Sequence, residues 1–213
     1  MPAYVYAARR DWAGYFDVMA NTPARGTLVE ALRRLEAEGL AVGELAVDLG
    51  CGEGRDTVEL LNRGWRVVAI DSSPDAAARV AARCGRECGR ESGAGWENRL
   101  SVRSEAMEGL TLPRVKLVNA SFTLPFCAPG AFAGLWAEIE GAIVPGGRFA
   151  GQFFGDRDSW AEMADRTHHN RKEVERMLGG FEIEMLAEEE KPSKESERFP
   201  KYWHVFHVVA KRR

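Results

Sequence analysis

Three glycines at alternate positions, Gly50, Gly52 and Gly54, follow closely behind an acidic residue, Asp48. Residues 45–54 read Leu-Ala-Val-Asp-Leu-Gly-Cys-Gly-Glu-Gly, which indicates a short buried strand that ends in a glycine turn. Glycine allows a positive φ and leaves no Cβ between the backbone and a ligand. Free N–H groups at the start of the next helix can bind an anion. This stretch therefore predicts a binding site for a nucleotide-like ligand.

A second acidic residue, Asp71, follows the apolar run Val-Val-Ala-Ile and lies 21 residues after Gly50. This is about the spacing expected for a carboxylate at the end of the second strand that binds a ribose diol. A dinucleotide-binding loop of the form G-x-G-x-x-G would need its third glycine at position 55, where this chain has Arg55. The glycine spacing therefore favours a nucleoside ligand other than a dinucleotide.

The elements that must position these residues alternate along the chain. The strands are expected at residues 45–49, 66–71, 100–102, 115–119, 148–154, 181–186 and 203–210. Helices are expected at residues 57–64, 73–82, 131–143 and 170–178, and Thr22 with Pro23 is expected to start the helix before the first strand. The last two strands follow one another without a helix, which predicts an antiparallel pair. The pattern predicts an α/β fold whose parallel sheet is covered on both faces.

The pattern V-D-L-G-C-G-x-G resembles motif I of the class I S-adenosylmethionine-dependent methyltransferases. The closing hairpin resembles the end of their Rossmann-like, doubly wound, seven-stranded sheet, which has the order 3-2-1-4-5-7-6 with strand 7 antiparallel. The run G-C-G-x-G-R-D, followed by L-x-x-x-G-x-x-V-x-x-x-D-x-S, is most similar to the small tellurite-resistance and thiopurine methyltransferases. The resemblance covers residues 40–210. It implies S-adenosyl-L-methionine as the cofactor and direct in-line methyl transfer.

The resemblance also implies roles for individual residues. Asp48 would help to orient the amino group of the cofactor, Asp71 would bind the ribose hydroxyls, and the turn after the third strand would border the adenine. The family usually has Asp in that turn, where this chain has Glu105. The full set of expected cofactor contacts is Asp48, Gly50, Cys51, Gly52, Gly54, Asp71, Ser72, Glu105, Ala106 and Asn119.

The acceptor is expected at the carboxyl ends of the strands, where ligands of open parallel sheets bind. The candidate substrate-binding residues are Tyr15, Ser121, Phe154 and Trp160. Asn119 and Phe122 resemble the ends of the [N/D]-P-P-[Y/F] motif of amino-methyltransferases, but both prolines are absent, so that mode of binding an amine is not expected. If the acceptor must lose a proton, His168 and His169 are the candidate bases, with His204 and His207 behind them.

Trp12, Tyr15, Phe16 and Met19 fall on one face of an N-terminal helix, which either packs on the domain or folds over the cofactor as a lid. We expect one domain over residues 1–213, with a helical cap over 1–40 and a cofactor-binding core over 41–213. The charged segment 188–198 is expected to be a solvated loop.

Composition limits the class of partner. A net charge of −3 argues against a nucleic-acid surface, and the sequence has no apolar run of membrane-spanning length. We expect a cytoplasmic monomer or homodimer that acts on a small molecule. Cys84 and Cys88 lack a second pair at zinc spacing, so no metal site is predicted. An NAD-dependent oxidoreductase and a non-catalytic S-adenosylmethionine-binding module remain alternatives.

Overall fold

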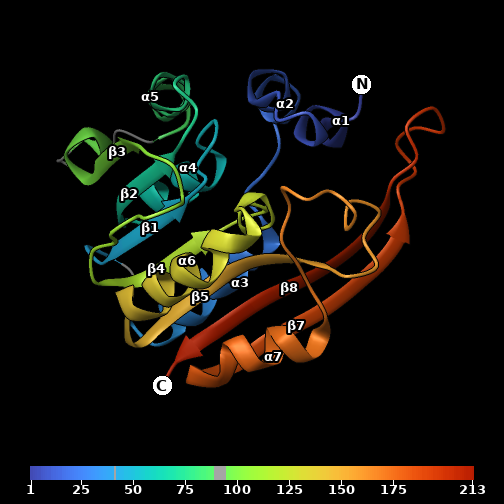
Figure 1. Ribbon diagram of the computed structural model, residues 1–213. Coiled ribbons are helices and arrows are strands. Elements are labelled where there is room, and N and C mark those ends of the chain that lie inside the picture. The colour runs from blue at the N-terminus through green and yellow to red at the C-terminus, as the bar shows by residue number, and fades with distance from the viewer. Residues whose placement is uncertain (41, 89–94) are drawn as a thin grey trace.

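Strands and helices alternate through most of the computed structural model, which describes residues 1–40, 42–88 and 95–213 (Figure 1). The α-helices of the described residues are α1 (Ala3–Ala8), α2 (Trp12–Met19), α3 (Gly26–Ala37), α4 (Arg55–Asn62), α5 (Ala76–Glu87), α6 (Pro129–Ala142) and α7 (Arg171–Met177). The strands are β1 (Leu45–Leu49), β2 (Arg66–Asp71), β3 (Leu100–Ser104), β4 (Val115–Ala120), β5 (Ile143–Gly155), β6 (His168–His169), β7 (Phe181–Pro192) and β8 (Tyr202–Arg212). Short 3-10 helices are η1 (Trp96–Arg99), η2 (Leu124–Phe126) and η3 (Leu178–Gly180).

The strands form one sheet in the order β3-β2-β1-β4-β5-β8-β7. The pairs from β3 to β5 are parallel, whereas β8 runs antiparallel to both β5 and β7. The two-residue strand β6 pairs beside the end of β5 and is absent from the predicted set. Without it, the order is the predicted 3-2-1-4-5-7-6, and the predicted fold class is confirmed.

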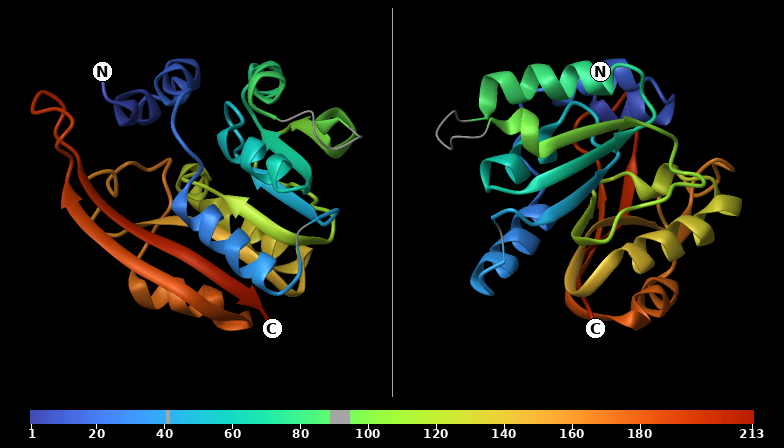
Figure 2. Two further views of the ribbon diagram at one scale, coloured as in Figure 1. Left: turned by 180° about the vertical axis from the view of Figure 1, so that it is seen from behind. Right: turned by 90° about the vertical axis from the view of Figure 1, so that its left-hand side faces the viewer.

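Alternation along each strand sends neighbouring side chains to opposite faces of the sheet. On β1, Ala46 packs with α3, α4 and α5, whereas Val47 packs with α6 and α7. On β5, Phe149 and Ala150 divide between the same two faces. The sheet is therefore the middle of three layers, and Figure 2 shows helices on both of its sides. Among the described helices, none is long and apolar enough to cross a membrane.

Helices α1 and α2 belong to neither layer. They lie over the carboxyl ends of the parallel strands, and Tyr4, Val5 and Ala7 of α1 pack in a third apolar cluster with Phe154 and Trp160. Of the predicted N-terminal cap over residues 1–40, only α1 and α2 cover the strand ends. Helix α3 instead packs its buried leucines against the face of the sheet, because its apolar stripe extends along the whole helix.

Two element boundaries differ from the sequence prediction. Helix α3 begins at Gly26, because the Thr22 hydroxyl donates to the Met19 carbonyl and accepts from Arg55 instead of capping a helix. Strand β7 continues to Pro192, so the first part of the segment expected to be a loop is strand. Arg157 pairs with both Glu188 and Glu190, which reduces the repulsion between these acidic side chains in the strand.

A buried arginine connects three elements beneath the site. Arg148 on β5 is 1% exposed, and its guanidinium donates to Glu184 on β7 (Nε–Oε2 2.7 Å) and to Glu38 just after α3 (Nη2–Oε1 2.8 Å). This network fixes α3 and the closing hairpin to the centre of the sheet. Removing one partner of a buried ion pair leaves the other charge desolvated and unpaired.

We expect Arg148→Met to lower the free energy of unfolding by about 3 kcal/mol, since it removes the arginine that pairs at 2.7 Å with Glu184, whose side chain is only 10% exposed. Urea titration followed by circular dichroism measures this. Arg33→Met is the matched control, because Arg33 also pairs with a glutamate but is largely exposed, and its midpoint should not move. Equal midpoints for Arg148→Met and the unsubstituted protein would contradict the assigned role.

Candidate functional site

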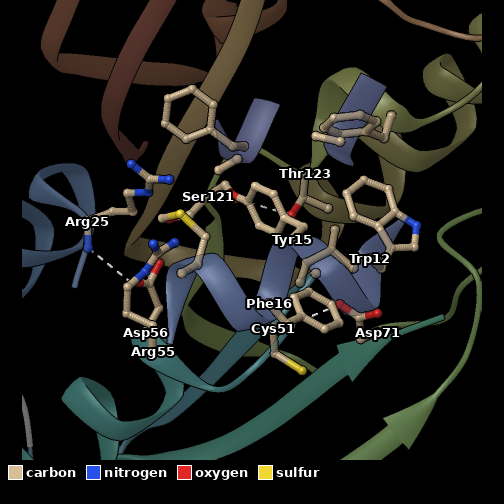
Figure 3. Close-up of a pocket in the computed structure, with 18 of the residues that line it drawn as sticks. Trp12, Tyr15, Phe16, Arg25, Cys51, Arg55, Asp56, Asp71, Ser121 and Thr123 are labelled. Atoms are coloured by element: carbon tan, nitrogen blue, oxygen red, sulfur yellow. Dashed lines mark hydrogen bonds and ion pairs between the residues drawn. The ribbon is translucent and has the colours of Figure 1, made fainter. Parts of the chain in front are cut away.

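A cavity of about 360 Å³ lies at the carboxyl ends of the parallel strands. Small-molecule sites have volumes of about 300–1,000 Å³ and are mostly apolar with a few placed polar groups. The lining comes from α1 and α2, from the turn after β1, from the ends of β2, β4 and β5, and from β8 (Figure 3). The cavity therefore lies where the topology of an open parallel sheet predicts a ligand.

The turn after β1 fits tightly against its surroundings. Gly50 has a φ of +70°, and a Cβ there would collide with the Thr123 side chain. Gly52 has a φ of +54°, and a Cβ there would lie 2.8 Å from the Phe16 ring of α2. Both positions require glycine for its backbone conformation and its size. The turn thus presents bare backbone to the cavity, as the sequence predicts.

Asp71 stands at the end of β2 beside this turn. Its Oδ2 accepts a hydrogen bond from the Gly52 N–H (2.9 Å), and its Oδ1 accepts one from the Ser73 N–H (2.8 Å). Burial raises the pKa of Asp71, while these two N–H groups oppose that effect. Each oxygen keeps a further lone pair, so the carboxylate is oriented and can still accept from a hydroxyl group. Figure 3 places Asp71 close to Phe16.

Asp48 forms a buried polar cluster beneath the turn. It accepts hydrogen bonds from the Thr57 hydroxyl (2.6 Å) and from the Asn119 amide (2.8 Å), and the same amide group donates to Asp56 (3.0 Å). Burial and the nearby Asp56 carboxylate raise the pKa of Asp48. The register of β1 against β4 brings Asp48 and Asn119 side by side. Asp48 reaches the cavity, while Asn119 supports it from behind.

Arg25, which was not among the predicted site residues, lines the same cavity. Its backbone N–H donates to Asp56 Oδ1 (3.0 Å), and its guanidinium carbon lies 4.5 Å from the centre of the Phe122 ring. Its Nε is buried and has no hydrogen-bond partner within the described residues. Burial and the nearby Arg55 lower the pKa of Arg25. An arginine in a connection gives no sequence signal, because its surroundings come from distant segments.

Figure 3 shows an electrostatic division of the cavity: Arg25 and the Arg55–Asp56 pair lie on one side, and Asp71 lies on the other. The glycine turn runs between them. A ligand that spans the turn would therefore meet a cation at one end and a hydroxyl-accepting carboxylate at the other. Between these ends, Cys51 contributes a neutral thiol, because burial raises its pKa well above the usual range.

The remaining part of the cavity is aromatic. The rings that line the whole cavity are Tyr4, Trp12, Tyr15, Phe16, Phe122, Phe126, Phe154, Trp160 and Trp203. Of these rings, Tyr15, Phe154 and Trp160 were predicted from the sequence as acceptor contacts, whereas Trp203 was not. The alternation of side chains along the last strand could have indicated Trp203, because it places Trp203 on the same face as Val205, which also lines the cavity.

The structure brings most of the predicted site residues to one place. Those that line the cavity are Tyr15, Asp48, Gly50, Cys51, Gly52, Asp71, Ser72, Glu105, Ser121, Phe154 and Trp160. Gly54, Ala106 and Asn119 stand next to lining residues but are not among them. Gly54 instead precedes α4 as its N-cap, and the Glu105 N–H donates to the Asp71 carbonyl.

The two candidate bases lie elsewhere. His168 and His169 form β6, and neither lines the cavity. The Nε2 atoms of both rings are buried and lack a hydrogen-bond partner within the described part of the chain. His169 packs against Phe132, with ring centres 4.6 Å apart, and burial lowers its pKa to about 4. Burial also lowers the pKa of His168. Their positions do not favour proton transfer in the cavity.

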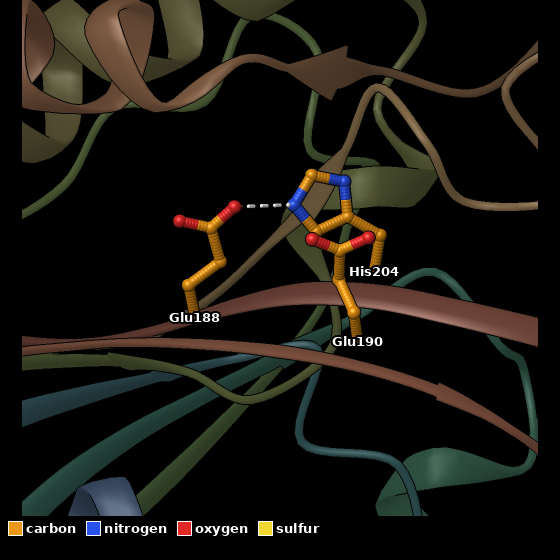
Figure 4. A group of neighbouring side chains, drawn as sticks. All are labelled: Glu188, Glu190 and His204. Atoms are coloured by element: carbon orange, nitrogen blue, oxygen red, sulfur yellow. Dashed lines mark hydrogen bonds and ion pairs between the residues drawn. The ribbon is translucent and has the colours of Figure 1, made fainter.

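Glu188, Glu190 and His204 form a separate group on the closing hairpin (Figure 4). Their ligand atoms are close enough to surround a cation. Arg157 already supplies one, because its guanidinium pairs with Glu188 (2.8 Å) and Glu190 (2.6 Å). The backbone N–H of Arg157 donates to His204 Nδ1 (3.0 Å), so His204 Nε2 carries the proton and donates to Glu188 (3.0 Å). These contacts explain why the three side chains lie together.

Comparison with known proteins adds independent findings. A family model described as a methyltransferase domain matches residues 46–147. The ribosomal RNA large subunit methyltransferase M of Thauera aminoaromatica is 47% identical over 62 residues, which are 26% of this chain and 17% of that protein. The carboxy-S-adenosyl-L-methionine synthase of Pseudomonas aeruginosa (strain UCBPP-PA14) is 32% identical over 138 residues, 61% of this chain and 53% of that protein. The chain spans about half or less of the length of these relatives.

Solved structures share the fold. TehB from Haemophilus influenzae matches with a TM-score of 0.73 and 14% identity over 93% of this chain and 66% of that chain. The 1,6-didemethyltoxoflavin-N1-methyltransferase of Burkholderia thailandensis, with bound 1,6-didemethyltoxoflavin and S-adenosylhomocysteine, matches with a TM-score of 0.62 and 21% identity. That match covers 100% of this chain and 91% of the other. At these identities, the two likenesses concern the fold alone.

The lowered pKa of His169 predicts a pH dependence of stability. In the unfolded chain this histidine takes up a proton as the pH falls below about 6.5. In the folded chain it stays neutral until the pH approaches its lowered pKa of about 4. Stability is therefore lost between these values, by about 3 kcal/mol for this group. We expect His169→Phe to lose correspondingly less stability than the unsubstituted protein when urea titrations at pH 7 and pH 4 are compared. Parallel losses in both proteins would contradict the buried neutral state.

Proposed function

We propose that the chain belongs to the class I S-adenosylmethionine-dependent methyltransferase superfamily and that it transfers a methyl group from S-adenosyl-L-methionine to a small-molecule acceptor. The observation that carries this proposal is the oriented Asp71 carboxylate beside the bare glycine turn, inside a cavity at the strand ends. A ribose diol donates to such a carboxylate, and the turn leaves room for the chain that continues from the ribose.

The residues present fit this cofactor at both ends. Gly50 and Gly52 line the cavity and carry no side chain, so the turn can contact a ligand through its backbone. Arg25 has a buried Nε without a partner among the described residues, and a carboxylate is the group that an arginine fork pairs with most readily. We assign the cofactor carboxylate to Arg25, its ribose to Asp71, and its adenine to the side of Ser72 and Glu105.

The acceptor is assigned to the aromatic part of the cavity, between the glycine turn and Trp203. S-adenosylmethionine supplies a methyl group that its sulfonium already activates. The protein therefore has to align the acceptor with this methyl group and exclude water. Good orientation can lower the activation free energy by roughly 7–11 kcal/mol. The α1–α2 cap covers the strand ends and serves both tasks. No histidine is among the described lining residues, so we assign no histidine base.

A small acceptor agrees with this geometry better than a nucleic acid does. The acceptor region lies beneath α1 and α2, and Tyr4 of α1 donates a hydrogen bond to the Phe199 carbonyl of the hairpin loop (2.7 Å). A folded RNA would have to displace this contact to reach the cavity. The cationic side chains at the cavity are also largely paired: Arg10 with Asp165, Arg55 with Asp56 and Lys191 with Glu189.

We expect Asp71→Ala to weaken binding of S-adenosylhomocysteine at least tenfold, because hydrogen bonds to a charged group contribute about 1.5–3 kcal/mol. Isothermal titration calorimetry measures the affinity. Asp75→Ala is the matched control, since Asp75 is exposed nearby and does not line the cavity. Unchanged affinity in Asp71→Ala would contradict the assigned ribose contact. Tighter binding of NADH than of S-adenosylhomocysteine would favour an oxidoreductase instead.

Arg25→Met tests the opposite end of the cofactor. We expect it to weaken S-adenosylhomocysteine about tenfold through loss of one charged hydrogen-bonded pair. It should leave 5′-methylthioadenosine, which lacks the amino-acid carboxylate, unaffected. Calorimetry with both ligands separates the local contact from damage to the whole site. An equal loss of affinity for both ligands would contradict the assignment of the carboxylate to Arg25.

A further inference from the structure

Lys201 is a buried cation that the proposed chemistry does not use. It lies just before β8, and its side chain is 0% exposed. Its ammonium group pairs with Asp158, whose side chain is also 0% exposed. Asp158 in turn accepts hydrogen bonds from the backbone N–H groups of Trp160 (2.9 Å) and His204 (3.1 Å). The ion pair therefore fixes the segment after β5 against the start of β8.

Three aromatic rings surround the ammonium group. Lys201 Nζ lies 4.0 Å from the centre of the Trp160 ring, 4.5 Å from Trp203 and 5.5 Å from Phe154. These are distances at which a cation is attracted to the electron-rich face of an aromatic ring. The rings also contact one another, with centres 5.8–6.0 Å apart. All three rings line the cavity, whereas Lys201 does not, so the cation stands behind them.

The three rings come from separate parts of the chain. Phe154 is on β5, Trp160 is in the segment after it, and Trp203 is on β8. An apolar side chain could fill the space of Lys201 without the cost of burying a charge. A cation differs from an apolar side chain in one respect. The strength of its attraction to an aromatic ring depends on how the ring is oriented toward it. Lys201 can therefore hold three independent rings in one arrangement.

We propose that Lys201 is a positioning residue that holds Phe154, Trp160 and Trp203 as one rigid wall of the cavity, and that this wall selects a planar aromatic acceptor. The proposal rests on the methyltransferase function proposed above. Preformed aromatic walls bind flat rings by stacked or edge-to-face contacts, which a saturated ring of similar size cannot make. Because the wall is ordered before the acceptor arrives, less side-chain freedom is lost on binding.

The test compares two probes that share one carbon skeleton and one hydroxyl group, the flat aromatic 2-naphthol and the saturated, puckered decahydro-2-naphthol. Calorimetry measures the binding of each to the protein, with and without saturating S-adenosylhomocysteine. We expect 2-naphthol to bind about tenfold more tightly than the saturated probe. Equal affinities for the two probes would overturn the proposal, since the wall would then contribute only apolar surface.

The role of Lys201 is tested by the double variant Lys201→Met, Asp158→Asn, which removes both buried charges together and leaves neither unpaired. We expect it to lose the preference for 2-naphthol while its affinity for S-adenosylhomocysteine stays unchanged. Lys201→Arg, which keeps a cation beside the rings, should retain the preference. The matched control is Lys172→Met, because Lys172 is exposed on α7. A double variant that keeps the full preference would overturn the proposal.

The measurements distinguish failure of the proposed methyltransferase function from failure of the proposed aromatic wall. If S-adenosylhomocysteine does not bind to the unsubstituted protein, the proposed function is contradicted, and the titrations without it still decide the role of Lys201. If S-adenosylhomocysteine binds but the probes are not distinguished, the proposed function stands and the aromatic wall does not. Should the double variant fail to fold by circular dichroism, the probe comparison in the unsubstituted protein still tests the aromatic wall, and loss of the preference in Lys201→Arg would overturn the role of the cation.

Discussion

The hydrogen bond from the Gly52 N–H to the Asp71 carboxylate is the contact on which the site depends. It joins the turn after β1 to the end of β2, two neighbouring parallel strands. The turn can make this contact only because Gly50 and Gly52 adopt positive φ values and carry no Cβ. The result is an oriented carboxylate beside open backbone, which a nucleoside with an attached amino acid can occupy.

The rest of the fold supports this arrangement from behind. Asn119 bridges Asp48 and Asp56 under the turn, and the register between β1 and β4 fixes where it stands. In front, α2 brings the Phe16 ring against Gly52. The donor side of the cavity is therefore polar and hydrogen-bonded, whereas the acceptor side is aromatic. A methyl group passing between them would leave a charged, ordered environment for an apolar one that excludes water.

Much of this could be predicted from the sequence, because the signals are local. Glycine spacing, the position of Asp71 and the alternation of strands and helices indicated the fold and the meeting of Asp71 with the glycine turn. Arg25 and Lys201 could not be predicted, because their roles depend on contacts with residues far away in the sequence. Arg25 packs on Phe122, and Lys201 pairs with Asp158. His168 and His169 read as a polar connection, yet they pair with β5 and pack beside rings such as Phe132 and Phe154.

We propose that one cavity holds the methyl donor against the glycine turn and the acceptor against the aromatic wall. A crystal structure with bound S-adenosylhomocysteine would show whether this is so. We expect ribose hydroxyls within hydrogen-bond distance of Asp71, the carboxylate at Arg25, and the sulfur directed toward Phe154 and Trp203. A ribose away from Asp71, or a sulfur that points away from the aromatic rings, would contradict it.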